Sequence, residues 1–258
     1  MVSPLQTKRV DQLTVQVYAS PEAVAAAAST IAQSILTSAI AESGKAAAIF
    51  ATGRSQVQFL QHLSHPSTPV DWSQVTGFHL DEYLGIAADH PASFRQYLHQ
   101  HLTRKVSLGA WHALEGDGLL PIDICQRYEQ KLRANHPIAL CCLGVGNNGH
   151  LAFNDPGVAS FDDLHWVKLV RLDRANRLQQ LDSSDFDTLQ AVPKYAFTLT
   201  LSAIRTAQNS LCIAYGKGKA EIVRRLLTGP VSAECPASIL RSLPQATLLV
   251  DQSAISQL

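Results

Sequence analysis

The sequence has no excess of either charge. Its 258 residues include 21 Lys and Arg and 21 Asp and Glu, which gives a formal net charge of zero. Proteins that bind nucleic acid or an anionic membrane through long-range electrostatics carry a surplus of positive charge. The balance offers no such attraction, so we predict neither nucleic acid nor a membrane as a partner. An anionic ligand would have to be held by a local pocket.

Long apolar runs are also missing. The first residues, MVSPLQTKRVDQLTVQV, contain no apolar stretch of the length that a signal peptide needs. The Ala-rich segment 24–40 is interrupted by Ser, Thr and Gln, which predicts an amphipathic helix that is too polar for a membrane span. Together these absences predict a cytoplasmic protein.

Cysteine is scarce and follows no metal or disulfide pattern. There are five cysteines, an odd number, and Cys141 and Cys142 are adjacent within an apolar run. This arrangement is typical of reduced thiols in the core of a cytosolic protein. The ten histidines show neither HExxH nor another clear ligand spacing, so we predict no metal.

The sequence does contain a regular alternation of strand-like and helix-like segments. Hydrophobic residues make up 46% of the chain, which is ample for one sizeable core. The alternation predicts an α/β fold: a single domain over residues 1–258 with a Rossmann-like, mostly parallel sheet and helices on both faces. The predicted strands are 13–19, 46–52, 75–80, 138–145, 166–172, 195–200, 210–215 and 246–250. One predicted helix begins at Pro21, and another is capped by Ser55 and covers residues 55–63. Further predicted helices begin near residues 93, 122, 219 and 236.

Three segments with unusual chemistry follow predicted strands. They are ATGRS at 51–55, HLDEYLG at 79–85 and GVGNNGHLAFNDP at 144–156. In open α/β sheets, ligands bind beyond the carboxyl ends of the strands. We therefore expect the three segments to share one site.

The first segment places Thr52, Gly53, Arg54 and Ser55 where a strand turns into a helix. Backbone N–H groups, hydroxyls and a guanidinium together suit a phosphate. Gly and Ser are also common in such turns for geometry alone, so both interpretations remain open. Further basic residues for a phosphate include Arg177, Lys194 and Lys219. Lys219 follows a Gly-Lys-Gly turn at the end of a predicted strand, whereas we interpret Lys217 as solvated surface.

The third segment has Gly144, Gly146 and Gly149 directly before His150. The spacing resembles a dinucleotide fingerprint, but no acidic residue ends a following strand ~20 residues later in a simple strand–helix–strand unit. We interpret it as a tight loop that lets backbone approach a ligand. A lone histidine after a strand is more often structural than catalytic. With Asp155 five residues later, a carboxylate is available to orient and charge-stabilise the imidazole.

The second segment carries Asp81 and Glu82 at the end of a predicted strand. Adjacent strand residues point to opposite faces, so the two acids should not share one role. One is expected to face the pocket while the other makes a structural bond. The alternative is a solvated acid pair, but the apolar run before it and Tyr83-Leu84 after it are not typical of a polar loop.

Taken together, the segments resemble the family of glucosamine-6-phosphate isomerases and 6-phosphogluconolactonases. The resemblance runs from ATGRS through FHLDEYLGIAADHPASFRQYL, LGVGNNGHLAFNDP, AVPKYAFTLTLSAI and GKGKAEIVRRLLTGP to CPASILR. The motifs FxxDEYxG and GxGxxGHxAFNxP are specific in combination. The lactonase branch typically has Gly-Asp-Glu-Arg at the strand end and Thr-Ala-Ser after its Gly-His. The chain has Leu-Asp-Glu-Tyr and His-Leu-Ala-Phe-Asn instead, which favours the deaminase branch.

The resemblance implies aldose–ketose isomerisation and deamination of glucosamine 6-phosphate, a small-molecule sugar phosphate, to fructose 6-phosphate and ammonia. Asp81 would move a proton between C2 and C1, His150 would assist ring opening, and Asp155 would hold His150. The phosphate would lie on the 52–55 turn with Arg177 and Lys219. Positioned acids and bases suffice for this chemistry, so no cofactor is expected.

The chain departs from the best-known deaminases at three positions. Asn148 stands where they usually have Asp, Asp155 where they usually have Glu, and Arg54 where a second small glycine is common. One negative charge beside His150 is therefore absent, so we expect a less basic imidazole and slower ring opening, and Asn148→Asp should raise the rate or shift its pH optimum upward. The chain stops soon after its last predicted strand, without the extension of the hexameric members, which implies a monomer or small homo-oligomer.

Two other functions remain open. One is a 6-phosphogluconolactonase, or an isomerase of the same fold for another sugar phosphate. The other is a regulator that senses a sugar phosphate. A regulator would need a DNA-binding module, for which the segment before the first predicted strand is too short, and it would not need an acid and a histidine in its pocket.

Overall fold

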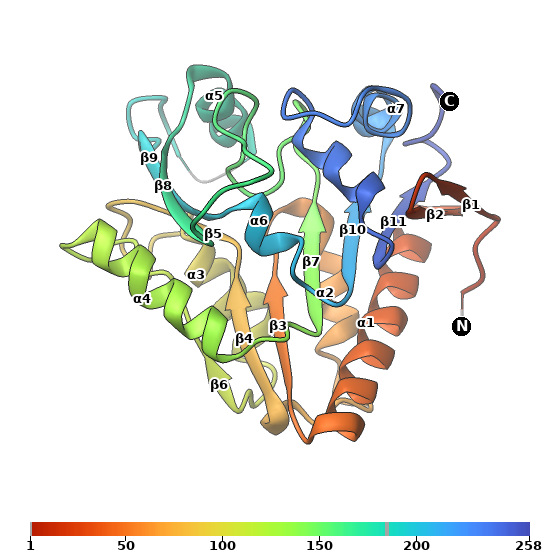
Figure 1. Cartoon of the computed structure of the whole chain (residues 1–258), viewed down its shortest axis with the longest axis horizontal. Helices are drawn as coiled ribbons and strands as arrows, with labels where there is room; N and C mark the ends of the chain where they lie inside the picture. Colours follow the sequence, from red (N-terminus) through yellow and green to blue (C-terminus); the bar gives the residue numbers. More distant parts are fainter. Residues whose placement is uncertain (1, 184–185) are drawn as a thin grey trace.

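The computed structural model describes residues 2–183 and 186–258. Its main element in this part of the chain is an eight-stranded sheet in the order β1-β2-β11-β10-β7-β3-β4-β6 (Figure 1). All neighbouring strands are parallel except β1 and β2. The strands are β1 Gln6–Val10, β2 Leu13–Tyr18, β3 Ala46–Phe50, β4 Val75–His79, β6 Ala110–Trp111, β7 Leu140–Gly144, β10 Ser210–Ala214 and β11 Ala246–Asp251. The predicted mostly parallel α/β fold is confirmed.

A second sheet corrects one part of the prediction. The predicted strands 166–172 and 195–200 exist as β8 (Val167–Arg171) and β9 (Tyr195–Leu199), but they do not join the parallel sheet. They form an antiparallel sheet with β5 (Asp81–Tyr83) in the order β5-β9-β8. The chain leaves β4 and enters β5 after a single residue, Leu80, whose carbonyl accepts a hydrogen bond from Leu199 N at 2.8 Å. Alternating hydrophobicity alone does not reveal which sheet a strand will join.

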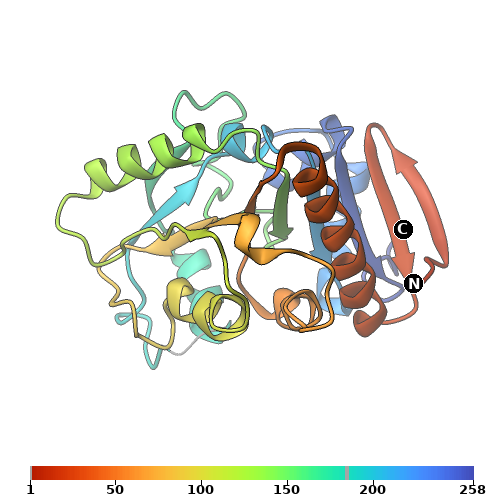
Figure 2. The same ribbon diagram turned by 90° about the horizontal axis from the view of Figure 1, so that it is seen from below.

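Helices cover both faces of the main sheet. The helices are α1 Pro21–Ser43, α2 Val57–Leu63, α3 Phe94–Leu98, α4 Pro121–Ala134, α5 Arg174–Ser183, α6 Leu201–Ile204 and α7 Ala220–Thr228. The π-helical turn His99–Thr103 extends α3, and the predicted helix near residue 236 is the 3-10 segment Pro236–Ser242. Figure 2 shows α4 on one side of the sheet and α2 on the other. The short elements β1, β5, β6, α5 and α6 were not predicted.

Strand β3 shows how the two faces are built. Ala46, Ala48 and Phe50 pack into the core under α1 and α2, while Ala47 and Ile49 pack into the core under α4 and α7. This alternation follows from the two-residue period of a strand. A strand buried on both faces therefore needs apolar residues at every position, which the run AAAIF supplies.

Helix α1 begins and ends where local signals place its ends. The Ser20 side chain accepts a hydrogen bond from Ala23 N, Pro21 occupies the first turn, and Gly44 closes the helix with a left-handed φ of 74°. By length and apolar composition alone the helix could cross a membrane, so the argument that its sequence is too polar was wrong. The packing of α1 shows instead that it is part of the core, because residues such as Val24 and Leu36 are fully buried against the sheet.

The five cysteines are all free and buried, as predicted for core thiols. Cys141 and Cys142 lie next to each other in β7 and point into the two different cores. Burial raises the pKa of both thiols. These thiols therefore contribute packing rather than reactivity.

The second sheet and α5 lie above the carboxyl ends of the parallel strands, at the top of Figure 1. An aromatic cluster fills the space between them. Tyr83 from β5 contacts the rings of Phe94, Phe153 and Phe186 with centroid distances of 5.0, 5.4 and 5.5 Å. The cluster packs the loop after β7 against β5 and thereby positions the segments that the sequence selects.

Candidate active site

The three selected segments meet at the carboxyl edge of the main sheet. Strand β3 lies between β4 and β7, so the segments that follow these strands are neighbours. The Gln56 side chain joins two of them, because its Nε2 donates to the Leu143 carbonyl at 3.3 Å. Phe153 N donates to the Thr198 hydroxyl at 3.1 Å, and Thr198 pairs with Asp81 in the second sheet. These contacts bring the loop that holds His150 close to Asp81.

His150 and Asp155 form the predicted pair. His150 Nδ1 lies 3.0 Å from Asp155 Oδ1, and the two residues are only 9% and 3% exposed. Burial by itself would raise the pKa of Asp155, but the hydrogen bond and charge of His150 and two side-chain amides lower it overall. The ionised carboxylate can only accept hydrogen bonds, so Nδ1 carries the donated proton. In the neutral ring, Nε2 is then the atom able to accept a proton.

Asn148 belongs to the same hydrogen-bonded group. Its Oδ1 accepts from the backbone N–H of His150 at 3.0 Å, and its Nδ2 donates to Asp155 Oδ1 at 2.7 Å. Because both ends of the amide are used, its orientation is fixed. The prediction that Asn148→Asp raises the rate or shifts its pH optimum upward stays untested, but the geometry is an argument for a lower rate. A carboxylate at this position would face another carboxylate across 2.7 Å and would lose the donated hydrogen bond.

Asn176 completes the group and was missed by the sequence analysis. It lies in the first turn of α5, is 2% exposed, and donates from Nδ2 to Asp155 Oδ2 at 2.7 Å. Its backbone N–H is capped by Asp173 Oδ1 at 2.7 Å. The Asp-x-x-Asn spacing at 173–176 is a helix-start signal that could have revealed α5. No local pattern indicates that Asn176 reaches back to Asp155.

The glycines of the loop serve His150 directly. A Cβ on Gly146 would lie 2.2 Å from both Nε2 and Cε1 of the imidazole, so only glycine allows the ring to lie over this backbone. Gly149 has a φ of +96°, where side chains are strained, and a Cβ there would meet Cys235 Sγ at 2.9 Å. The loop was expected to bring backbone close to a ligand. At Gly146 the group that approaches it is the histidine.

Asp81 and Glu82 have different roles, as the strand period predicts. Glu82 is fully buried and accepts hydrogen bonds from Ser93 Oγ at 2.7 Å and Arg95 N at 2.9 Å, so it anchors the start of α3. Asp81 is 7% exposed, and its carboxylate takes part in no hydrogen bond that the described residues make. Burial, followed by the charge of Glu82, raises the pKa of Asp81 well above its usual range. Such a carboxyl group is well suited to binding and releasing a proton.

The predicted phosphate turn, residues 52–55, links β3 to α2. Gly53 has a φ of +99°, and a 3-10 turn over Arg54–Gln56 begins the helix. Ser55 does not cap the helix as predicted; its Oγ accepts from Gln56 Nε2 at 3.1 Å. Two tyrosine hydroxyls hold successive carbonyls, Tyr97 on Gly53 at 2.8 Å and Tyr215 on Arg54 at 3.0 Å. Because each peptide unit is planar and trans, these bonds also set the direction of the N–H groups that follow.

The two predicted cations differ in their surroundings. Lys219 Nζ donates to the Val145 carbonyl and to Asn147 Oδ1, both at 2.7 Å, and so lies against the glycine loop. Burial lowers the pKa of Lys219. Arg177 instead donates to the carbonyls of Leu189 and Val192 and ties α5 to that loop. None of the contacts in the described ranges joins Arg177 to the 52–55 turn, and its phosphate-binding role stays a prediction.

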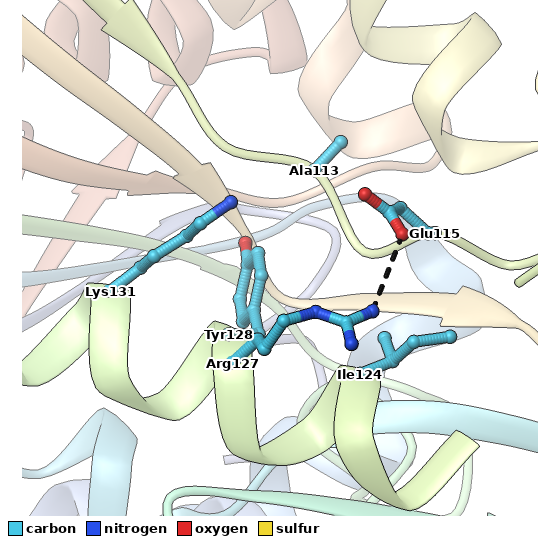
Figure 3. Close-up of a pocket in the computed structure, with 6 residues that line it drawn as sticks. All are labelled: Ala113, Glu115, Ile124, Arg127, Tyr128 and Lys131. Atoms are coloured by element: carbon cyan, nitrogen blue, oxygen red, sulfur yellow. Dashed lines mark ion pairs between the residues drawn. The ribbon is translucent and has the colours of Figure 1, made fainter. Parts of the chain in front are cut away.

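A recess beside α4 lies apart from this group (Figure 3). Its lining includes Tyr128, and an ion pair of 3.7 Å joins Arg127 to Glu115 across it. None of the predicted site residues lines the recess. Residues 2–183 and 186–258 contain no group of three or more His, Cys, Asp and Glu side chains arranged to hold a metal ion.

The chain is similar in sequence to one family model and to glucosamine-6-phosphate deaminases. The family model described as glucosamine-6-phosphate isomerases/6-phosphogluconolactonase matches residues 19–249. A glucosamine-6-phosphate deaminase of Lactobacillus delbrueckii subsp. bulgaricus is 33% identical over 224 residues, which cover 87% of this chain and 92% of the relative. A glucosamine-6-phosphate deaminase of Listeria monocytogenes is 35% identical over 190 residues, covering 73% and 78%.

Solved structures show the same fold. A monomeric glucosamine-6-phosphate deaminase superposes with a TM-score of 0.86 at 28% identity, covering 94% of this chain and 98% of the other. A 6-phosphogluconolactonase from Trypanosoma brucei superposes with a TM-score of 0.79 at 17% identity, covering 98% and 100%, and this likeness shows the fold alone. The family model spans nearly the whole chain, and the chain therefore belongs to the glucosamine-6-phosphate isomerase/6-phosphogluconolactonase family.

Proposed function

We propose that the protein converts glucosamine 6-phosphate to fructose 6-phosphate and ammonia by aldose–ketose isomerisation and deamination. The observation that carries the proposal is the placement of a buried Asp81 close to a hydrogen-bonded His150–Asp155 pair, at the carboxyl edge of the sheet. The named relatives of the chain are glucosamine-6-phosphate deaminases at 33% and 35% identity. An acid and a histidine in these positions match what the reaction requires.

Ring opening is the task of His150. The sugar must release its ring oxygen before C2 becomes acidic, so a proton has to move from the C1 hydroxyl to that oxygen. An imidazole whose Nδ1 is held by Asp155 can accept and return this proton at Nε2. Asp155 keeps its charge, because the pKa of its carboxyl is lowered by His150 and the two amides despite burial.

Asp81 carries the isomerisation. Its carboxylate takes the proton from C2 of the open-chain sugar, the C2 ammonium group gives a proton to O1, and the electrons form an enolamine across C1 and C2. Return of the proton to C1 leaves an iminium at C2. Water adds to C2 and ammonia leaves, which gives the ketose. The raised pKa of Asp81 makes the carboxylate a stronger base for the first of these steps.

The phosphate contributes binding energy away from the reacting carbons. The 52–55 turn, with Thr52, Gly53, Arg54 and Ser55, is the proposed phosphate site, and Lys219 is its proposed cation. The turn and Lys219 lie beside the same strand, β7, since Gln56 contacts Leu143 and Lys219 contacts Val145. We keep Arg177 as a proposed contributor from α5.

Lactone hydrolysis is the alternative that the fold allows. It needs a histidine to activate water at C1 but no base beneath C2. The residues that flank Asp81 and Glu82 favour deamination, because the chain has Leu80 and Tyr83 where the lactonase branch typically has Gly and Arg, and the named relatives at 33% and 35% identity are deaminases. We therefore favour the deaminase. We further propose a cytoplasmic monomer, which the likeness to a monomeric deaminase supports.

The test is a comparison of two rates for the same enzyme preparation. Ammonia release from glucosamine 6-phosphate should exceed hydrolysis of 6-phosphogluconolactone in kcat/KM. The Asp81→Asn variant distinguishes the two reactions further, because it should abolish the first and leave any lactone hydrolysis in place. A lactonase kcat/KM above the deaminase value would replace this proposal by the alternative.

A further inference from the structure

Both carboxylate oxygens of Asp155 are occupied by side-chain donors. Oδ1 accepts from His150 Nδ1 at 3.0 Å and from Asn148 Nδ2 at 2.7 Å, and Oδ2 accepts from Asn176 Nδ2 at 2.7 Å. His150 and Asn148 belong to the same loop as Asp155. Asn176 comes from a different element, the first turn of α5. The contact therefore joins the loop after β7 to the helix that lies above it.

The amide of Asn176 is kept in a costly arrangement. The residue is 2% exposed, and its Oδ1 has no hydrogen-bond partner among the residues that the structure describes. A buried polar atom without a partner costs about 1–3 kcal/mol. Turning the amide over would not relieve this cost, because the oxygen would then face the Asp155 carboxylate. A polar group retained under these conditions calls for a reason beyond packing.

The effect of the contact on Asp155 follows from the geometry of a carboxylate. The terminal torsion of an aspartate is broad, so donors at one oxygen leave the plane of the group poorly determined. A donor on the opposite oxygen removes that freedom. Since His150 is held through Asp155 Oδ1, fixing the carboxylate plane also fixes the plane of the imidazole.

We propose that Asn176 is a positioning residue that fixes the Asp155 carboxylate and so holds His150 with its proton on Nδ1 and with Nε2 available for proton transfer. The consequence for ring opening rests on the proposed function, whereas the effect on the imidazole does not. Because Asn176 belongs to α5, His150 is correctly held only when α5 is seated on the site. Gln180 of the same helix contributes to this seating, since its Oε1 accepts from the Tyr83 hydroxyl at 2.8 Å.

Two substitutions remove the donor in different ways. Asn176→Leu keeps the approximate size and removes both polar atoms, while Asn176→Asp keeps the shape and presents an acceptor to Asp155 Oδ2. For each we expect kcat for ammonia release to fall about 10–100-fold, since small misplacement of a reacting group has effects of this order. KM should stay within about twofold, because Asn176 is not proposed to bind the substrate.

A second readout does not depend on activity. In ¹⁵N-histidine NMR spectra of the unliganded protein, the His150 signals, assigned by their loss in His150→Gln, should show the Nδ1-protonated tautomer. In both Asn176 variants the same signals should move toward a mixture of tautomers. Asn209→Leu is the matched control, because it removes one amide donor to a carbonyl, that of Ala139 at 3.0 Å, on the β10 side of the sheet. It should change neither kcat nor the His150 signals.

The outcomes separate the inference from the proposed function. His150 signals that stay unchanged in a folded Asn176 variant, as judged by thermal melting, overturn the positioning role whatever happens to kcat. If the His150 signals move as expected in the variants but the wild-type protein releases no ammonia, the positioning role is supported and the deaminase is rejected. A loss of kcat together with the tautomer change supports both.

Discussion

Two nearly buried carboxylates, Asp81 and Asp155, have opposite electrostatic surroundings. Burial acts on both in the same direction and favours the protonated form. At Asp81 the charge of Glu82 adds to this effect, and the pKa rises well above its usual range. At Asp155, His150 and the amides of Asn148 and Asn176 outweigh burial, and the pKa is lowered. The direction of the shift follows from the balance between burial and the charges and donors around each acid; at Glu82, which also accepts several hydrogen bonds, burial prevails and the pKa is raised.

The difference suits two separate tasks. A carboxyl group that binds a proton readily is appropriate for accepting one from C2 and returning it to C1. A carboxylate that stays ionised is appropriate as a permanent partner for an imidazole. The following experiments test this division, beginning with the largest expected effect.

Removing the base should have the largest effect. Asp81→Asn keeps the shape of the side chain but cannot take the C2 proton, so we expect turnover to fall roughly 10²–10⁴-fold with little change in substrate affinity. Steady-state kinetics together with binding of an inert sugar phosphate measure both quantities. A variant that retains more than about a tenth of the wild-type turnover would remove Asp81 from this role.

Removing a cation should affect binding rather than proton transfer. Lys219→Ala is expected to remove a charge-assisted contact worth roughly 1.5–3 kcal/mol, which is about a 10–150-fold loss of affinity for phosphorylated sugars. Arg177→Ala should weaken the same binding if its predicted role is correct. The exposed Lys217 offers a control, since Lys217→Ala removes a charge from the same turn. Unchanged affinity in both Lys219→Ala and Arg177→Ala would show that the phosphate site is misplaced.

Adding a charge beside Asp155 should blur the difference between the two acids. Asn148→Asp would place a carboxylate where an amide now donates to Asp155 Oδ1 at 2.7 Å. One of the two carboxyl groups at positions 148 and 155 would then hold a proton. We therefore expect turnover to fall about tenfold, the lower end of what a weakened proton-transfer pair costs. Asn135→Asp, at the C-cap of α4, is the matched control. A faster Asn148→Asp enzyme would contradict the structural interpretation.

The two acids should also differ in their effect on stability. The folded-state pKa of Asp81 is raised, so its contribution to stability is full below its unfolded pKa and is lost as pH rises through the folded value. The folded-state pKa of Asp155 is lowered, so its contribution to stability is present above its unfolded pKa and is lost as pH falls through the folded value. At neutral pH, Asp81→Asn should therefore raise Tm and Asp155→Asn should lower it. Equal signs in calorimetry would contradict the comparison.

The smallest expected effect is that of a chelator. If Asp81 and Asp155 move and orient protons, ammonia release should continue unchanged after treatment with excess EDTA. Activity that disappears and returns with one divalent metal would show that the reaction needs a metal ion and would contradict a mechanism carried by Asp81 and His150 alone. The dialysed wild-type enzyme without chelator is the reference.

Much of the scaffold was predictable because its signals are local. The run AAAIF at Ala46–Phe50 is apolar at every position, as a strand between two helical layers requires. Ser20-Pro21 and Gly44 mark the ends of α1. The second sheet could not be anticipated in the same way. Its short strand Asp81–Tyr83 is recognisable only when Tyr195–Leu199 lies beside it, because strand pairing depends on contacts between segments far apart in the chain.

The sequence pointed to several residues that the fold brings together, but it showed neither Asn176 nor how these residues are connected. The spacing of His150 and Asp155 indicated their contact, and the structure contains it. The partner role of Asn176 had no counterpart in any local motif, because it depends on where α5 lies over the loop. The effect of Asn148→Asp stays a prediction, but the structure supplies an argument for the opposite sign, since the sequence records a missing charge and not the hydrogen bond that the amide donates in its place.

The sequence by itself determined the fold class, the family and the side chains available for chemistry, because periodicity, turn residues and motifs are properties of short segments. Only the tertiary structure decided how those side chains behave. It buried Asp81 beside the charge of Glu82, and it gathered three donors around Asp155 from two separate elements. The same kind of carboxyl group thus has a raised pKa in one place and a lowered pKa in the other, because its pKa depends on solvent and neighbours that folding alone brings together.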